Sequence, residues 1–163
     1  MNNIKICVIG LGYVGLPIAV ELSKKFSVVG YDLNEERIKE LKKKKDSTNE
    51  VDLKSTNLKL RSLIFTSDEK DIKGSNFFII TVPTPVDKNN IPDLSFLKNA
   101  SMTVSRYLKK NDTVVYESTT YPGCTDDYCI PILEKYSNLK LNKDFFCGYS
   151  PERINPGDTV HTI

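Results

Sequence analysis

Three glycines with the spacing GxGxxG stand near the beginning of the chain, at Gly10, Gly12 and Gly15. They follow an apolar run at residues 4–9 and precede a stretch of helical periodicity at 13–25. Glycines at a turn from a strand into a helix let backbone amides approach a pyrophosphate, which the positive end of the helix also attracts. We therefore expect this turn to bind a dinucleotide. The expected contacts come from Gly10, Leu11, Gly12, Tyr13, Val14 and Gly15.

An acidic residue, Asp32, ends the next apolar run, at 26–31, roughly twenty residues after the glycines. Its carboxylate would accept hydrogen bonds from the adenosine ribose and would repel a 2′-phosphate, so the pattern favours NAD over NADP. Arg37, one helical turn further on, is expected beside the adenosine end of the same ligand, and the alternative is that its charge permits NADP to bind. The alternative is a purely structural turn, with Asp32 only capping the following helix.

Two further segments place unusual residues directly after apolar runs. Prolines stop the run at 77–82 in the segment TVPTP, which contains Thr84. Hydroxyl residues follow the run at 113–117 in the segment ESTTYPG. There Ser118 and Thr119 are candidates to lie near the nicotinamide and to orient a water or a substrate oxygen. Rigid surface turns and helix capping are the alternatives for both segments.

The segment YSPERINPG follows the last apolar run, at 145–149. Glu152 is a candidate general base at a strand end, and the neighbouring Arg153 and Asn155 suit phosphates and sugar hydroxyls. The alternative is a solvated turn stiffened by its prolines.

The elements that must position these residues form a regular series. Short apolar runs rich in β-branched residues alternate with stretches of helical period. The expected strands cover 4–9, 26–31, 62–66, 77–82, 113–117 and 145–149. The expected helices cover 13–25, a segment capped by Asn34, 95–109 and 125–135, the last with an awkward Pro131. This alternation predicts an α/β fold of Rossmann type, a doubly wound, mainly parallel sheet with helices on both faces, in one domain spanning 1–163.

The composition limits the possible partners. The chain has 163 residues, of which 39% are hydrophobic, and a formal net charge of +2. The sequence has no excess of one charge that would indicate binding to nucleic acid or to a membrane surface. The lysine run at 42–45 is interpreted as a solvated helix end. The first apolar run is too short for a signal peptide or a membrane span, so a cytoplasmic location is expected.

The cysteines show no pattern of a metal or disulfide site. Cys7, Cys124, Cys129 and Cys147 lack CxxC spacing, and the only histidine is His161. We expect free, mostly buried thiols and no metal site.

Four segments together, IGLGYVGLPIAVEL, VPTP, ESTTYPG and SPERINPGD, resemble the N-terminal domain of the UDP-glucose/GDP-mannose dehydrogenase family in order and spacing. The resemblance covers essentially the whole chain. The form PERINPGD resembles the branch that acts on UDP-N-acetylhexosamines such as UDP-N-acetylglucosamine. The UDP-glucose branch usually reads PEFL followed by a second glutamate, where this chain has Pro156.

The resemblance implies an NAD-dependent nucleotide-sugar 6-dehydrogenase of surface polysaccharide biosynthesis, for O-antigen or capsule. Such enzymes oxidise C6 of a UDP-sugar twice, through a cysteine thioester. Thr119 would then help to position water, Glu152 would act as the base, and Arg153 and Asn155 would contact the UDP-sugar. The implied NAD contacts are Gly10 to Gly15, Asp32, Arg37, Thr84, Ser118 and Thr119.

The cysteine nucleophile of the family lies beyond the last residue of this chain, and none of the four cysteines falls in its motif. We therefore expect an N-terminal fragment without the central helical and C-terminal substrate domains, inactive alone, from an enzyme that is a homodimer at full length. The open alternatives are a UDP-glucose 6-dehydrogenase domain, a non-catalytic nucleotide-binding module, and a methyltransferase, whose nucleotide loop also follows a first strand.

Overall fold

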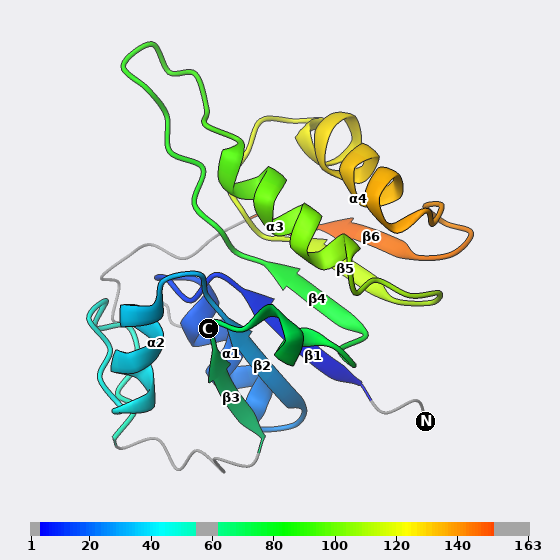
Figure 1. Cartoon of the computed structure of the whole chain (residues 1–163). Helices are drawn as coiled ribbons and strands as arrows, with labels where there is room; N and C mark the ends of the chain where they lie inside the picture. The colour runs from blue at the N-terminus through cyan, green and yellow to red at the C-terminus, as the bar shows by residue number, and fades with distance from the viewer. Residues whose placement is uncertain (1–3, 55–61, 152–163) are drawn as a thin grey trace.

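A computed structural model of the chain describes residues 4–54 and 62–151, and its strands form one six-stranded sheet (Figure 1). Every neighbouring pair is parallel, in the order β3-β2-β1-β4-β5-β6. The strands are β1 (Lys5–Ile9), β2 (Ser27–Tyr31), β3 (Leu63–Thr66), β4 (Phe77–Ile80), β5 (Thr113–Tyr116) and β6 (Phe146–Tyr149). The winding direction reverses between β1 and β4, and ligands of such sheets bind at this switch point. The predicted doubly wound α/β fold is confirmed.

Helices connect the strands and cover both faces of the sheet. They are α1 (Gly15–Ser23), α2 (Glu35–Lys42), α3 (Ser95–Ser105) and α4 (Ile130–Ser137), with a 3₁₀ helix at Glu69–Ile72 and a π-helical turn at Thr125–Cys129. Figure 1 shows α3 and α4 side by side over one face of the sheet. Each crossover returns the chain to a parallel strand, as a doubly wound sheet requires.

The central strand β1 is buried on both faces, which explains its continuous apolar sequence. Cys7 and Ile9 belong to one buried cluster, which also contains Leu97 of α3. Ile6 and Val8 point the opposite way, into a second cluster with residues of α1 and α2. A parallel sheet covered on both faces needs such uninterrupted runs, and this makes β1 and β4 easy to recognise.

The helices are shorter than predicted where the helical spacing of apolar residues extends beyond the helix itself. The first helix begins at Gly15, not at residue 13, because the glycine turn occupies the preceding residues. Helix α3 ends at Ser105, not at 109, since the chain turns there toward β5. The predicted helix at 125–135 is a π-helical turn followed by α4, whose first turn contains Pro131. The helical segment is continuous from the π-helical turn into α4, so Pro131 removes an N–H inside it, and the wider π-helical turn before Pro131 is the local departure that allows a proline there.

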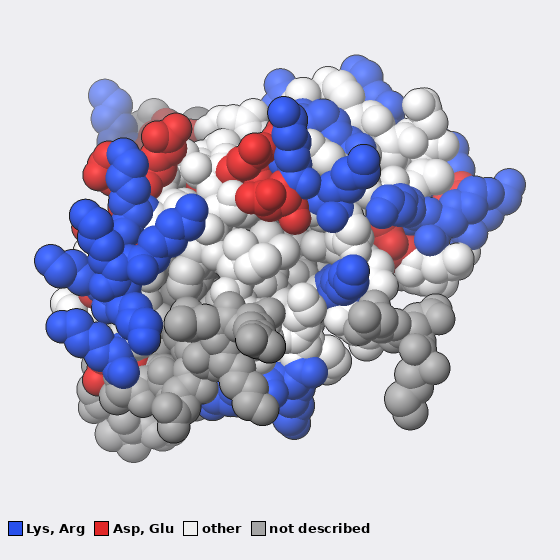
Figure 2. Space-filling model, turned by 60° about the horizontal axis from the view of Figure 1, so that its bottom comes forward, with Lys and Arg blue, Asp and Glu red and all other residues white. Residues whose placement is uncertain are grey.

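Two segments without apolar periodicity are nevertheless ordered. The 3₁₀ helix at Glu69–Ile72 was not predicted; it is capped by Asp68, which accepts a hydrogen bond from the Lys70 amide (2.9 Å). The polar segment after α2 is anchored through the buried Leu53. Lysines 42–45 are exposed at the end of α2, on the side where Figure 2 shows basic side chains gathered, which agrees with a solvated helix end.

Among the described residues, no helix is long and apolar enough to cross a membrane.

Candidate functional site

The turn from β1 into α1 is tight because of its first glycine. Gly10 has φ +94°, a conformation that side chains other than glycine rarely adopt, and its amide donates to the Tyr31 carbonyl (2.9 Å). A Cβ at Gly15 would stand 1.8 Å from the Gly10 carbonyl oxygen, so α1 packs directly under the turn. A Cβ at Gly12 would meet nothing within 4 Å, because this glycine borders open space.

Asp32 reaches from the end of β2 to the glycine turn. Its Oδ2 accepts a hydrogen bond from the Leu11 amide (2.7 Å), and its Oδ1 accepts one from the Asn34 amide (2.9 Å). The cap of α2 comes from Asn34 instead, whose side chain accepts from the amides of Glu36 and Arg37. Helix capping therefore does not account for Asp32, and each carboxylate oxygen keeps lone pairs for a ligand hydroxyl.

Two hollows meet at the switch point between β1 and β4. One, of about 490 Å³, lies between the glycine turn and Asp32 and extends to Arg37. The other, of about 570 Å³, extends from the glycine turn to the loops that follow β4 and β5. The residues common to both hollows are Gly12, Thr81, Val82 and Pro83. Together they form an extended cleft beyond the carboxyl ends of the strands, where the fold predicts a ligand.

The structure brings the predicted dinucleotide residues into this cleft, with Gly15 lying beneath it. Gly10, Leu11, Asp32 and Arg37 line the first hollow. The second hollow is lined by Tyr13, Val14, Thr84, Ser118 and Thr119, among others. The first residues of the loops after β4 and β5 thus line the same hollow as the residues before α1, whose amino end has no side-chain cap in the described structure. Its positive dipole end is suited to a phosphate.

Hydroxyl groups join the two strand-end loops. Ser118 is buried and donates to the Val82 carbonyl (2.6 Å), and Thr84 donates to the Thr119 carbonyl. The side chain of Thr119 is exposed at the second hollow. Ser118 and Thr84 therefore hold the loops in place, and each hydroxyl still has acceptor capacity for a ligand.

Sequence reasoning missed several residues that line the cleft. Thr81, at the end of β4, is buried and donates to the carbonyl of Gly10 (2.8 Å). Phe96, Asn99 and Thr103 of α3 line the first hollow. The four-residue spacing of Asn99 and Thr103 places both on one face of a helix, and this was the available signal.

Three predicted residues, Glu152, Arg153 and Asn155, lie outside the described residues. The description ends at Pro151, one residue after Ser150, whose amide donates to the Tyr116 carbonyl (2.9 Å).

All four cysteines are free, and Cys7, Cys124 and Cys129 are buried, as expected. Burial raises the pKa of Cys129 and of Cys147 to about 12, and that of Cys7 also rises. These thiols are protonated at neutral pH and are poor nucleophiles. No cluster suited to a metal ion occurs in the part of the chain that the structure describes.

Substitution of Gly12 by alanine tests whether the turn binds a diphosphate. The added methyl group enters open space, so the thermal midpoint should stay close to that of the wild type. Affinity for the dinucleotide should fall about tenfold, because the methyl group occupies space that the phosphates need. Calorimetric titration measures the loss. The control is Gly148→Ala on β6, where a Cβ also meets nothing; unchanged affinity in Gly12→Ala would contradict the assignment.

A family model described as the UDP-glucose/GDP-mannose dehydrogenase family, NAD binding domain, matches residues 4–163. A UDP-N-acetyl-D-glucosamine 6-dehydrogenase of Pseudomonas aeruginosa is 54% identical over 164 residues, which cover 100% of this chain and 38% of that protein. Protein CapL of Staphylococcus aureus is 56% identical and is matched over 99% of this chain and 38% of its own length. The chain thus spans 38% of the length of these relatives.

Solved structures show the same architecture. A UDP-D-ManNAc dehydrogenase from Pyrococcus horikoshii superposes with a TM-score of 0.85 at 38% identity, over 94% of this chain and 37% of that one. A ternary complex of GDP-mannose dehydrogenase from Pseudomonas aeruginosa gives 0.84 at 30% identity, over 93% of this chain and 36% of that one.

Proposed function

Because the chain belongs to the UDP-glucose/GDP-mannose dehydrogenase family, in which it is the NAD binding domain, we propose that it serves a nucleotide-sugar 6-dehydrogenase. The whole protein then oxidises C6 of a UDP-N-acetylhexosamine to the uronic acid in two NAD-dependent steps, for surface polysaccharide. The observation that carries the proposal is the contact of Asp32 with the Leu11 amide, at the mouth of the glycine turn (2.7 Å). This contact directs a carboxylate into the cleft where a dinucleotide ribose would lie.

The residues of the cleft fit NAD in a definite orientation. The glycine turn and the amino end of α1 would hold the diphosphate, and Asp32 would accept hydrogen bonds from the adenosine ribose. Thr84 and Ser118 would flank the nicotinamide half, whose ring accepts the hydride when the cofactor is bound. The open space beside Gly12 supports this arrangement, since the backbone there is free to approach the phosphates.

The substrate side of the proposal depends on residues at the end of β5 and after β6. Thr119, exposed at the second hollow, would help to position a water molecule. Glu152 would act as the base, and Arg153 and Asn155 would contact the UDP-sugar. The raised pKa values of Cys7, Cys129 and Cys147 make these thiols poor nucleophiles, so we propose that the nucleophilic cysteine belongs to another part of the full-length enzyme. We also propose that this enzyme is a homodimer.

Calorimetric titration of the chain with NAD, NADP and S-adenosylmethionine tests the proposal. NAD should bind, and NADP should bind at least about tenfold more weakly, because its 2′-phosphate would meet the Asp32 carboxylate. S-adenosylmethionine, as the control, should not bind. Tighter binding of the methyl donor than of NAD would overturn the proposal, and so would the absence of NAD binding.

A further inference from the structure

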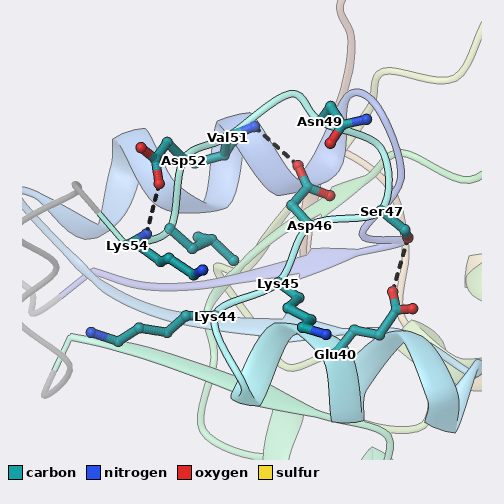
Figure 3. A pocket seen from close by; sticks show the side chains of 10 residues that line it. Glu40, Lys44, Lys45, Asp46, Ser47, Asn49, Val51, Asp52 and Lys54 are labelled. Carbon is teal, nitrogen blue, oxygen red and sulfur yellow. Dashed lines mark hydrogen bonds between the residues drawn. The ribbon is translucent and has the colours of Figure 1, made fainter.

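A buried carboxylate organises the polar loop after α2. The side chain of Asp46 is only 2% exposed. Its Oδ1 accepts from the amide (3.0 Å) and the hydroxyl (2.6 Å) of Thr48, and its Oδ2 accepts from the amides of Glu50 (2.9 Å) and Val51 (3.0 Å). Figure 3 shows Asp46 turned toward Val51 within this loop. One side chain therefore fixes the course of the backbone from 46 to 51.

Asp46 also pairs with Arg37 of α2, whose side chain is 9% exposed, at 2.8 Å between Nη2 and Oδ1. Burial alone would raise the pKa of Asp46, but hydrogen bonds from Thr48, Val51 and Arg37 outweigh it and lower the pKa. The carboxylate is therefore charged at neutral pH. Removing Asp46 would leave the buried guanidinium with a more distant and more exposed counter-charge, Glu40, at 3.8 Å from Nη1, so Arg37 depends mainly on Asp46.

Arg37 links Asp46 to the glycine turn. Its Nε donates to the Leu11 carbonyl (2.9 Å), while the Leu11 amide donates to Asp32 (2.7 Å). The amide and the carbonyl of Leu11 are thus both bound by side chains, and the Leu11 side chain is fully buried. The turn expected to bind the diphosphate is fixed by Arg37 as well as by its own glycines.

The loop that Asp46 fixes also forms a wall of the first hollow. Ser47 and Thr48 line that hollow together with Asp32 and Arg37. The Ser47 hydroxyl accepts from Arg37 Nη1 (3.0 Å) and donates to Glu40 (2.8 Å). Every nitrogen of the guanidinium therefore has an acceptor within the protein, since Nη2 contacts Asp46 and Nε contacts Leu11.

We propose that Asp46 is a positioning residue and a determinant of cofactor choice in the dinucleotide site. It holds Arg37 against the Leu11 carbonyl and orients the Ser47–Thr48 wall at the adenosine end. It also keeps the Arg37 guanidinium engaged with acceptors of the protein, so that this cation is not available for a 2′-phosphate. The inference rests on the proposed binding of NAD in this cleft.

The variant Asp46→Asn tests it in the full chain by titration with NAD and NADP. NAD affinity should fall about tenfold, because Arg37 loses its buried charged partner and is no longer held in place as the donor to the Leu11 carbonyl. NADP affinity should fall much less, since the released guanidinium can approach the 2′-phosphate. The ratio of the two affinities should therefore narrow severalfold, which a general loosening of the fold would not produce.

Asp144→Asn is the matched control. Asp144 also accepts from a backbone amide, that of Lys140 (3.0 Å), and pairs with a lysine, Lys110 (3.3 Å), but it precedes β6 and lines neither hollow. Its affinities for both nucleotides should equal those of the wild type. Equal losses of NAD and NADP in Asp46→Asn, or no loss, would overturn the inference.

A second variant, Arg37→Lys, keeps the inference testable if Asp46→Asn does not fold. Lysine retains the positive charge opposite Asp46 but lacks the guanidinium nitrogens that donate to Leu11 and to Ser47 at the same time. NAD affinity should fall about fivefold or more in this variant, and unchanged affinity would overturn the inference. Failure of the wild-type chain to bind NAD would instead refute the proposed function itself.

Discussion

Substitution of Gly15 by alanine should lower the free energy of unfolding by about 3 kcal/mol or more, the largest loss that we expect from a single methyl group in this chain. The new Cβ would stand 1.8 Å from the Gly10 carbonyl oxygen and 2.4 Å from Thr81 Oγ1. Neither atom can move away easily. Gly10 is tied to the Tyr31 carbonyl through its amide, and the Thr81 hydroxyl is bound to the Gly10 carbonyl (2.8 Å). Denaturant unfolding followed by circular dichroism measures the loss.

The Gly15→Ala variant should lose NAD binding as well as stability, because α1 can accommodate the methyl group only by moving away from the turn. Gly12→Ala is the matched control, since it adds the same methyl group to the same motif in open space. Its free energy of unfolding should equal that of the wild type, and only its affinity for NAD should fall. A Gly15→Ala chain within about 1 kcal/mol of wild-type stability would show that α1 packs less closely on the turn than the structure indicates.

The sheet and its cofactor loop were predictable because their signals are local. The continuous apolar runs of β1 (Lys5–Ile9) and β4 (Phe77–Ile80) reflect burial on both faces. The glycines and Asp32 lie within a single strand–helix–strand unit. Its two parallel strands end side by side, so the spacing in the sequence is enough to predict that Asp32 lies near the glycines. Sequence reasoning therefore reached the centre of the cleft at β1 and β2.

Side-chain contacts that link a helix to a loop, or one loop to another, were not predictable. Arg37 was expected at the adenosine end, and it does line the hollow, but its pairing with Asp46 lies in a polar segment without any period. Likewise, nothing in TVPTP or ESTTYPG indicates that the hydroxyl of Ser118 reaches Val82. The Ser118 contact forms only once β4 and β5 are neighbours in the sheet, so residue type alone does not reveal it.

Substitution of Asp32 by alanine should weaken NAD binding about a hundredfold and NADP binding considerably less. In the proposed complex the carboxylate accepts hydrogen bonds from the adenosine ribose, and bonds to a charged acceptor contribute more than neutral ones. NADP has a phosphate at the position of one of these hydroxyls, so the variant removes a repulsion from NADP while it removes an attraction from NAD. Calorimetric titration with both nucleotides gives the two losses separately.

The same substitution also removes the acceptor of the Leu11 amide (2.7 Å), and this contribution must be separated from the ribose contact. Loss of the internal hydrogen bond loosens the turn that holds the diphosphate, which both nucleotides share, and so weakens both alike. Loss of the ribose contact weakens NAD more than NADP, because NADP keeps only one of the two hydroxyls. Asp68→Ala is the control, because Asp68 also accepts from a backbone amide after a strand, that of Lys70 (2.9 Å), yet lines neither hollow. Equal losses of NAD and NADP in Asp32→Ala would leave Asp32 as a support of the turn and remove it from cofactor selection.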